Sequence, residues 1–120
     1  MLDRVGLGDR AATPVADLAH GERRLLELAL ALAAEPALLL LDEPMAGAGS
    51  EETKHMIEII AGLKSRAGIL LIEHDMDAVF QLADRVTVIV EGGVIASGSP
   101  DAISADSAVR EAYLGSEEHA

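Results

Sequence analysis

The sequence predicts an α/β fold in which short apolar strands alternate with amphipathic helices. Aliphatic runs at 37–41 ("ALLLL") and 68–74 ("GILLIEH") are short enough for buried strands. A β-branched run, "VTVIV" at 86–90, predicts a third strand. The segments between these runs have helical spacing, and an order of strand, helix, strand, helix, strand implies right-handed crossovers. We therefore expect a mostly parallel sheet with an edge hairpin and flanking helices.

The composition is that of a globular aliphatic protein. The chain has 120 residues, about one average domain, and half of them are apolar although it contains only one Phe, one Tyr and no Trp. With no cysteine it offers neither a disulfide nor a thiolate metal site. No apolar run comes near the roughly 20 residues of a membrane helix, and the first residues lack the apolar stretch of a signal peptide. We expect a cytosolic chain.

The charge balance argues against nucleic acid as a partner. The formal net charge is −12, from 21 acidic and 9 basic residues, whereas nucleic-acid phosphates require cationic partners. A nucleotide can still bind, because backbone N–H groups and a metal ion can hold phosphates locally.

The first predicted helix runs from about Glu22 to Ala34. Four apolar residues recur there at helical spacing, and Pro36 ends the segment. They are Leu25, Leu28, Ala29 and Leu32. The run at 37–41 follows directly and is apolar on both faces, which favours a central parallel strand.

The second predicted helix begins near Ser50, a candidate N-cap. Its apolar stripe consists of Met56, Ile59, Ile60 and Leu63. After the strand at 68–74, "MDAVFQLA" at 76–83 predicts a short helix. The segment 86–97 then predicts a hairpin that turns at Gly92 and Gly93.

Two groups of polar residues follow the first two strands: "DEP" at 42–44 and "EHD" at 73–75. Ligands of open parallel sheets bind beyond the carboxyl ends of the strands. In phosphoryl transfer a protein must hold Mg²⁺ and orient a nucleophile, so Asp42 could hold the metal while Glu43 acts as general base. An isolated acidic pair is, however, more often a solvated or capping pair.

The order of four motifs resembles that of the ATP-binding cassette (ABC) ATPases, which have a P-loop NTPase fold. The matching segments are "LAHGE" (18–22) at the signature loop, "ALLLLDE" (37–43) at the Walker B strand, "LLIEHD" (70–75) at the switch histidine and "VIVEGGVIASGSP" (88–100) at the hairpin. They occur in this order between residues 18 and 100, across most of the chain.

The subfamily that the chain resembles is the ATP-binding subunit of branched-chain amino acid uptake transporters. "DEPMAGAGSEET" (42–53) and the ending "SPDAISADSAVREAYLG" (99–115) carry this resemblance. The family ending V-x-x-A-Y-L-G is matched by Val109, Ala112, Tyr113, Leu114 and Gly115. The resemblance implies a partial ABC ATPase domain over 1–97 and a C-terminal extension over 98–120. Without it, the tail would be interpreted as a plain amphipathic helix.

The resemblance also implies roles for single residues. Glu43 and His74 would be catalytic, with His74 contacting the γ-phosphate and holding the attacking water. Asp42 would hold Mg²⁺ through water.

Two further segments are implied to act between subunits. The signature residues Ala19, His20, Gly21 and Glu22 would bind the γ-phosphate held by the other subunit of an ATP-sandwich dimer. The D-loop residues that cross to that subunit would be Gly47, Ala48 and Gly49. The family usually has Ser at the position of Ala19, and many members have Asp at that of Gly49. The lost Ser hydroxyl removes a phosphate donor, at a cost of about 1 to 3 kcal/mol.

The implied cofactors are ATP and Mg²⁺, both in the complete cassette. The implied partners are a second ATP-binding subunit, transmembrane permease subunits and, indirectly, a solute-binding protein. The implied location is the cytoplasmic face of the plasma membrane.

A phosphate-binding loop of the form G-x-x-x-x-G-K-[ST] does not occur in the 120 residues. The Walker A and Q-loop of the family precede the signature, so we expect this chain to be the C-terminal half of a cassette. We also expect self-association, because an isolated half would leave strand edges unpaired and apolar faces uncovered.

Three functions are compatible with these motifs. The first is the ATPase subunit of a branched-chain amino acid importer. The second is a non-catalytic module that pairs with a complete cassette. The third is a small metal-dependent hydrolase using Asp42, Glu43, His74 and Asp75, which is disfavoured because no second histidine stands at ligand spacing.

Overall fold

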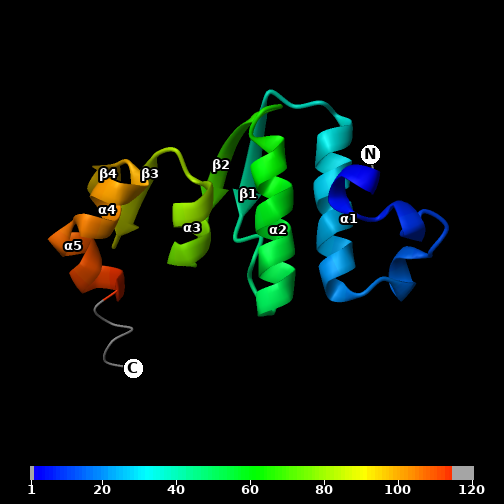
Figure 1. The fold of residues 1–120 in the computed structure, drawn as a ribbon, viewed down its shortest axis with the longest axis horizontal. Helices are drawn as coiled ribbons and strands as arrows, with labels where there is room; N and C mark the ends of the chain where they lie inside the picture. Colours follow the sequence, from blue (N-terminus) through cyan, green and yellow to red (C-terminus); the bar gives the residue numbers. More distant parts are fainter. Residues whose placement is uncertain (1, 115–120) are drawn as a thin grey trace. The chain divides into compact units, whose positions relative to one another are not determined.

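The computed structural model describes residues 2–114 and divides into two compact units, Met1–Asp75 and Met76–Ala120 (Figure 1). Gly115, the last residue of the predicted ending, lies outside the described residues. The α/β class predicted from the sequence is confirmed. The boundary predicted between 97 and 98 stays a prediction.

The first unit holds two helices, a two-stranded sheet and three short 3₁₀ helices. Its elements are η1 (Leu2–Val5), η2 (Gly8–Arg10), η3 (Val15–Asp17), α1 (His20–Ala33), β1 (Leu38–Asp42), α2 (Ser50–Leu63) and β2 (Gly68–Ile72). Strand β1 pairs with β2 in parallel, with Leu38 opposite Gly68 and Asp42 opposite Ile72. The two strands therefore end at the same edge of the sheet.

The helices form where the apolar spacing predicts them. The four apolar residues of α1 are all buried, and α2 buries Met56, Ile60 and Leu63. Both helices begin slightly earlier than expected: α1 starts at His20 rather than Glu22, and the N-cap of α2 is Gly49 rather than Ser50. The predicted strand ends also shift, since β1 includes Asp42 and β2 stops at Ile72 instead of continuing to His74.

The sheet of β1 and β2 is buried on one face only. Leu39 is 4% exposed, but its neighbours Leu38 and Leu40 are 58% and 65% exposed. On β2 the same open face carries Leu70 and Ile72, each 54% exposed. The sequence pattern favours burial on both faces, whereas in the described residues only one is covered, as the expectation of uncovered apolar faces anticipates.

The second unit consists of helices packed around an antiparallel hairpin. Its elements are α3 (Met76–Leu82), β3 (Val86–Val90), β4 (Gly93–Gly98), α4 (Pro100–Ala105), α5 (Ser107–Val109) and a π-helical turn, η4 (Arg110–Leu114). The hairpin turn consists of Glu91 and Gly92 rather than the predicted Gly92 and Gly93, because Gly93 already pairs as the first residue of β4. The φ angles of 50° and 79° are the left-handed pair of a type I′ turn. Strand β3 pairs with β4 in antiparallel fashion, as the predicted hairpin requires.

The C-terminal helices share a core with this hairpin. Val86, Val88, Ile103 and Val109 are buried together, and Tyr113 packs against them. The Tyr113 hydroxyl donates a hydrogen bond to the backbone oxygen of Ile89 at 2.7 Å. Two residues of the V-x-x-A-Y-L-G ending, Val109 and Tyr113, thus attach this segment to the hairpin. Among residues 2–114, no helix has the length and apolar character needed to cross a bilayer.

Replacing Leu40 by Lys should reduce self-association without unfolding the chain. The side chain is 65% exposed on the open face, so the change removes apolar surface from that face while the free energy of unfolding moves by less than about 1 kcal/mol. Sedimentation velocity and urea unfolding measure the two effects. The matched control is Leu39→Ala on the buried face, which should cost about 2 to 5 kcal/mol. Equal costs at the two positions would contradict the assignment of the faces.

Candidate functional site

The predicted catalytic residues lie at the shared edge where β1 and β2 end. Parallel pairing places Asp42 opposite Ile72, so Glu43 and His74 both follow the last pair of the ladder. The Glu43 N–H donates to the Ile72 backbone oxygen at 2.7 Å and continues the pairing by one residue. The register alone therefore brings two segments that are 31 residues apart to one site.

Glu43 and His74 are in direct contact. The His74 Nδ1 lies 2.7 Å from the Glu43 Oε1, and the two side chains are 70% and 48% exposed respectively. Because a carboxylate only accepts, Nδ1 carries the proton in this hydrogen bond. The Nε2 of the neutral ring is then left as an acceptor, and it becomes a donor when the ring is protonated.

The surroundings of His74 raise its pKa above the ordinary value of 6.5. The main cause is the hydrogen bond from Glu43, followed by the negative charge of the same carboxylate. Desolvation acts in the opposite direction, and the negative charges of Glu73 and Asp75 add smaller contributions that raise the pKa. The carboxylate of Glu43 therefore favours the protonated form of the His74 ring.

The loop after β1 contains two left-handed residues. Glu43 has φ of 47°, which costs free energy for a residue with a Cβ, and Gly47 has φ of 74°. The Ala46 N–H donates to the Glu43 backbone oxygen and the Ala48 N–H to that of Met45, both at 3.0 Å. A tight turn thus holds Glu43 in a conformation that aims its side chain at His74.

Of the two glycines in the predicted D-loop, only Gly47 has a backbone conformation that favours glycine. Gly49 has φ of −73° and ψ of 174°, an extended backbone that any residue adopts, and no atom lies within 4 Å of where its Cβ would be. The D-loop role of these residues and of Ala48 stays a prediction.

Asp42 occupies the last position of β1 with an exposed side chain. Mg²⁺ in phosphoryl-transfer sites is commonly held by one or two carboxylates together with phosphate oxygens, and a lone carboxylate at a strand end fits that donor set. Within residues 2–114, no three His, Cys, Asp or Glu side chains are grouped closely enough to bind a metal by themselves. This argues against the metal-dependent hydrolase, which needs such a group.

The predicted signature residues form the start of α1. Ala19 is the N-cap but has no side-chain acceptor, and the Glu22 Oε1 instead accepts from the Ala19 N–H at 2.9 Å. The Glu22 Oε2 pairs with the Arg10 Nε at 3.0 Å. Among the described residues, the N–H groups of His20, Gly21 and Glu22 find no acceptor, and such a helix start can bind an anion.

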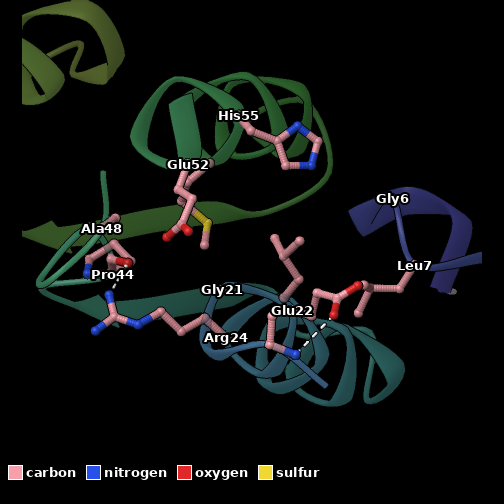
Figure 2. A pocket seen from close by; sticks show the side chains of 12 residues that line it. Gly6, Leu7, Gly21, Glu22, Arg24, Pro44, Ala48, Glu52 and His55 are labelled. Carbon is pink, nitrogen blue, oxygen red and sulfur yellow. Dashed lines mark hydrogen bonds between the residues drawn. The ribbon is translucent and has the colours of Figure 1, made fainter. Parts of the chain in front are cut away.

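A pocket of about 300 Å³ lies between α1, α2 and the loop after β1. The signature residues Ala19, Gly21 and Glu22 line it together with the D-loop residue Ala48. Figure 2 shows Gly21 and Glu22 on one side of the pocket and Glu52 and His55 of α2 on the opposite side. The predicted signature and D-loop segments therefore border one cavity.

Two polar residues near the site were missed by the sequence analysis. Arg24 donates from Nη1 to the Pro44 backbone oxygen at 2.8 Å (Figure 2). The Glu73 Oε2 accepts from the Met45 N–H at 3.3 Å. These contacts join residues 20 and 28 positions apart, so no local pattern indicates them.

Two known families match parts of the chain. The family described as "ABC transporter" matches residues 1–46. The family described as "Branched-chain amino acid ATP-binding cassette transporter" matches residues 94–119. The two matched segments include the signature, the Walker B strand and the C-terminal ending.

Curated relatives of the chain have descriptions that are consistent with these family matches. The high-affinity branched-chain amino acid transport ATP-binding protein LivG of Escherichia coli K12 is 42% identical over 116 residues, which cover 95% of this chain and 46% of that protein. BraF of Pseudomonas aeruginosa, which has the same description, is 40% identical over 95% of this chain and 46% of its own length. The chain spans about half the length of these relatives.

The fold likewise matches a solved structure. The ADP conformation of MJ1267, an ATP-binding cassette of an ABC transporter, superposes with a TM-score of 0.84 and 28% identity. The match covers 95% of this chain and 47% of that one.

The replacement Glu43→Gln should lower the pKa of His74 toward 6.5, because the amide lacks the charge that stabilises the imidazolium. Titration of the His74 ring proton by NMR measures the shift, and Glu91→Gln in the hairpin turn is the control.

The same interaction has a defined effect on stability. Since folding raises the pKa of His74, the pair stabilises the fold fully below pH 6.5, and this contribution is lost as the pH rises through the raised pKa. In Glu43→Gln this pH dependence of urea unfolding should weaken. An unchanged His74 titration in the variant would refute the contact.

Replacing Gly47 by Ala should lower the free energy of unfolding by about 1 to 2 kcal/mol, because φ of 74° is strained for any residue with a Cβ. Gly21→Ala is the matched comparison. Its Cβ would meet only the Glu52 carboxylate, at 3.3 Å, and this exposed side chain can move. Because Ala favours a helix, the expected change there ranges from none to a gain of about 1 kcal/mol. Urea denaturation measures both variants. A larger loss of stability in Gly21→Ala than in Gly47→Ala would contradict the assigned strain at Gly47.

Proposed function

Because the chain is a relative of the ATP-binding cassette proteins of ABC transporters and has the fold of part of them, we propose that it belongs to an ATPase subunit. This subunit would power the uptake of branched-chain amino acids. The observation that carries the proposal is the 2.7 Å contact between Glu43 and His74 at the ends of two parallel strands. An acid and a histidine so placed can handle the proton of an attacking water.

The proposed reaction is hydrolysis of the bond between the β- and γ-phosphates of ATP. A water oxygen attacks the γ-phosphorus, the bond to the bridging oxygen breaks, and ADP and phosphate leave. Glu43 accepts the proton of the water as a general base. His74 orients the Glu43 carboxylate through Nδ1. Its Nε2 accepts from the water when the ring is neutral and donates to the γ-phosphate when the ring is protonated.

Asp42 would hold Mg²⁺ at the end of β1, through water. The ion, when bound, neutralises charge on the β- and γ-phosphates. The position of Asp42 beside Glu43 keeps the metal ligand and the base on consecutive residues, so that a strand end fixes both.

The start of α1 is proposed to bind the γ-phosphate held by a second subunit. The free N–H groups of His20, Gly21 and Glu22 and the positive end of the helix support this role. Ala19 contributes no hydroxyl, so the anion would rely on backbone donors. The D-loop residues Gly47, Ala48 and Gly49 would contact the same second subunit.

The transported solute and the partners are inferred from relatives. LivG and BraF are described as branched-chain amino acid transport proteins, which supports the same solute class here. Such a subunit would work with transmembrane permease subunits at the cytoplasmic face of the membrane, with a solute-binding protein on the other side. ATP and Mg²⁺ would bind to the complete cassette.

The test is a chimaera in which this chain replaces the matching residues of E. coli LivG, so that LivG supplies the nucleotide-holding part. We expect Mg²⁺-dependent ATP hydrolysis. Glu43→Gln should lower kcat by about a hundredfold or more, since a general base typically contributes that much. His74→Ala should also lower kcat, and Glu91→Gln in the hairpin turn should leave it unchanged. A phosphate-release assay measures these rates.

The alternative of a non-catalytic partner module predicts a different result. A folded chimaera that bound Mg-ATP but hydrolysed none would favour that module and contradict the ATPase. Loss of activity in Glu91→Gln equal to that in Glu43→Gln would equally contradict the role of the acid–histidine pair.

A further inference from the structure

We propose that Arg24 and Glu73 are positioning residues that hold the loop at Pro44 and Met45 from two sides, and thereby fix Glu43 against His74. The inference rests on the proposed function, because it concerns the geometry of the proposed catalytic pair. All the residues involved belong to the unit Met1–Asp75.

Glu73 is a buried acid that has no direct role in the proposed reaction. Its side chain is only 1% exposed. The Oε2 accepts from the Met45 N–H at 3.3 Å, and the Oε1 accepts from the His74 N–H at 3.1 Å. One carboxylate thus binds the backbone of both segments that carry the catalytic pair, so their separation depends on it.

Arg24 holds the preceding residue of the same loop. Its Nη1 donates to the Pro44 backbone oxygen at 2.8 Å in a half-buried contact (Figure 2). Arg24 lies in the second turn of α1, shortly after the predicted signature residues. A movement of α1 would therefore be passed directly to the peptide group between Pro44 and Met45, one peptide group beyond the one that joins Glu43 to Pro44.

The loop needs such support because its first residue is strained. Glu43 adopts φ of 47°, and a non-glycine residue keeps this conformation only where its surroundings over-determine it. Both catalytic side chains are about half exposed or more, so packing alone does not hold them. The buried Met45 side chain, 5% exposed, and the two hydrogen bonds supply the restraint.

These contacts connect the proposed signature residues to the catalytic pair. Phosphate binding at the start of α1 would reposition Arg24, Arg24 would move Pro44, and Glu43 would follow. Glu73 would keep the His74 side of the pair in place meanwhile. Arg24 and Glu73 touch neither water nor phosphate in this scheme, so they act only through Glu43 and His74.

The first test uses the full chain without nucleotide. In Glu73→Gln the amide keeps the shape of the side chain but only one acceptor oxygen, so amide hydrogen exchange at Met45 should accelerate at least about tenfold. The NMR signal of the His74 Nδ1 should also move toward that of an unbonded ring. Glu91→Gln is the matched control and should change neither. Unchanged Met45 exchange and an unchanged Nδ1 signal in a folded Glu73→Gln would overturn the proposal.

The second test uses the chimaera with LivG. Glu73→Gln and Arg24→Lys should each lower kcat by about tenfold to a hundredfold while the KM for ATP stays constant, because small misplacements of reacting groups have effects of this size. In a Glu43→Gln background the same changes should lower kcat less than about twofold, since their target is already lost. Equal losses in both backgrounds, accompanied by a lower melting temperature, would show a merely structural role.

These tests separate the inference from the function on which it rests. If the parent chimaera is inactive but Met45 exchange responds to Glu73→Gln, the proposed function fails and the holding contact stands. If the parent is active and both variants keep full kcat, the contact has no catalytic role and the proposal is overturned. If Glu73→Gln does not fold, the kcat of Arg24→Lys tests the proposal instead. The Arg24 side chain is only half-buried, so this variant should fold.

Discussion

The parallel pairing of β1 with β2 is the constraint on which the site depends. In a parallel pair the carboxyl ends of both strands lie at the same edge, so whatever follows them is brought together without further design. The register places Asp42 opposite Ile72, and the next residues along each strand include Glu43 and His74. A shift of one residue would turn the apolar side chains of a strand to the other face and separate this pair.

The loop that follows β1 converts this proximity into a defined contact. Glu43 adopts a left-handed backbone, which turns its carboxylate toward His74 at 2.7 Å. The strain is held locally by a tight turn with Gly47 and, over longer distances, by Arg24 and Glu73. Functional sites commonly store strain in this way, because a side chain held under restraint needs no reorganisation during the reaction.

Local electrostatics oppose the overall charge of the chain. The net charge of −12 repels an anion at long range, yet within the part of the chain that the structure describes the N–H groups of His20, Gly21 and Glu22 find no acceptor. Glu22 does not cancel this potential, because its carboxylate is bound to the Ala19 N–H and to Arg10. The phosphate site proposed for this helix start therefore depends on backbone donors that act at short range.

The sequence by itself determined the elements, the motifs and the identity of the acid–histidine pair. Apolar spacing located the four buried residues of α1, and the short aliphatic runs located both parallel strands, because the type of each element follows the local period of its apolar side chains. Only the tertiary structure decided that one face of the β1–β2 sheet is open. It also decided that Arg24 and Glu73 hold the loop at Pro44 and Met45. Contacts between residues 20 or more positions apart depend on how strands and helices are placed in space, which no local pattern encodes.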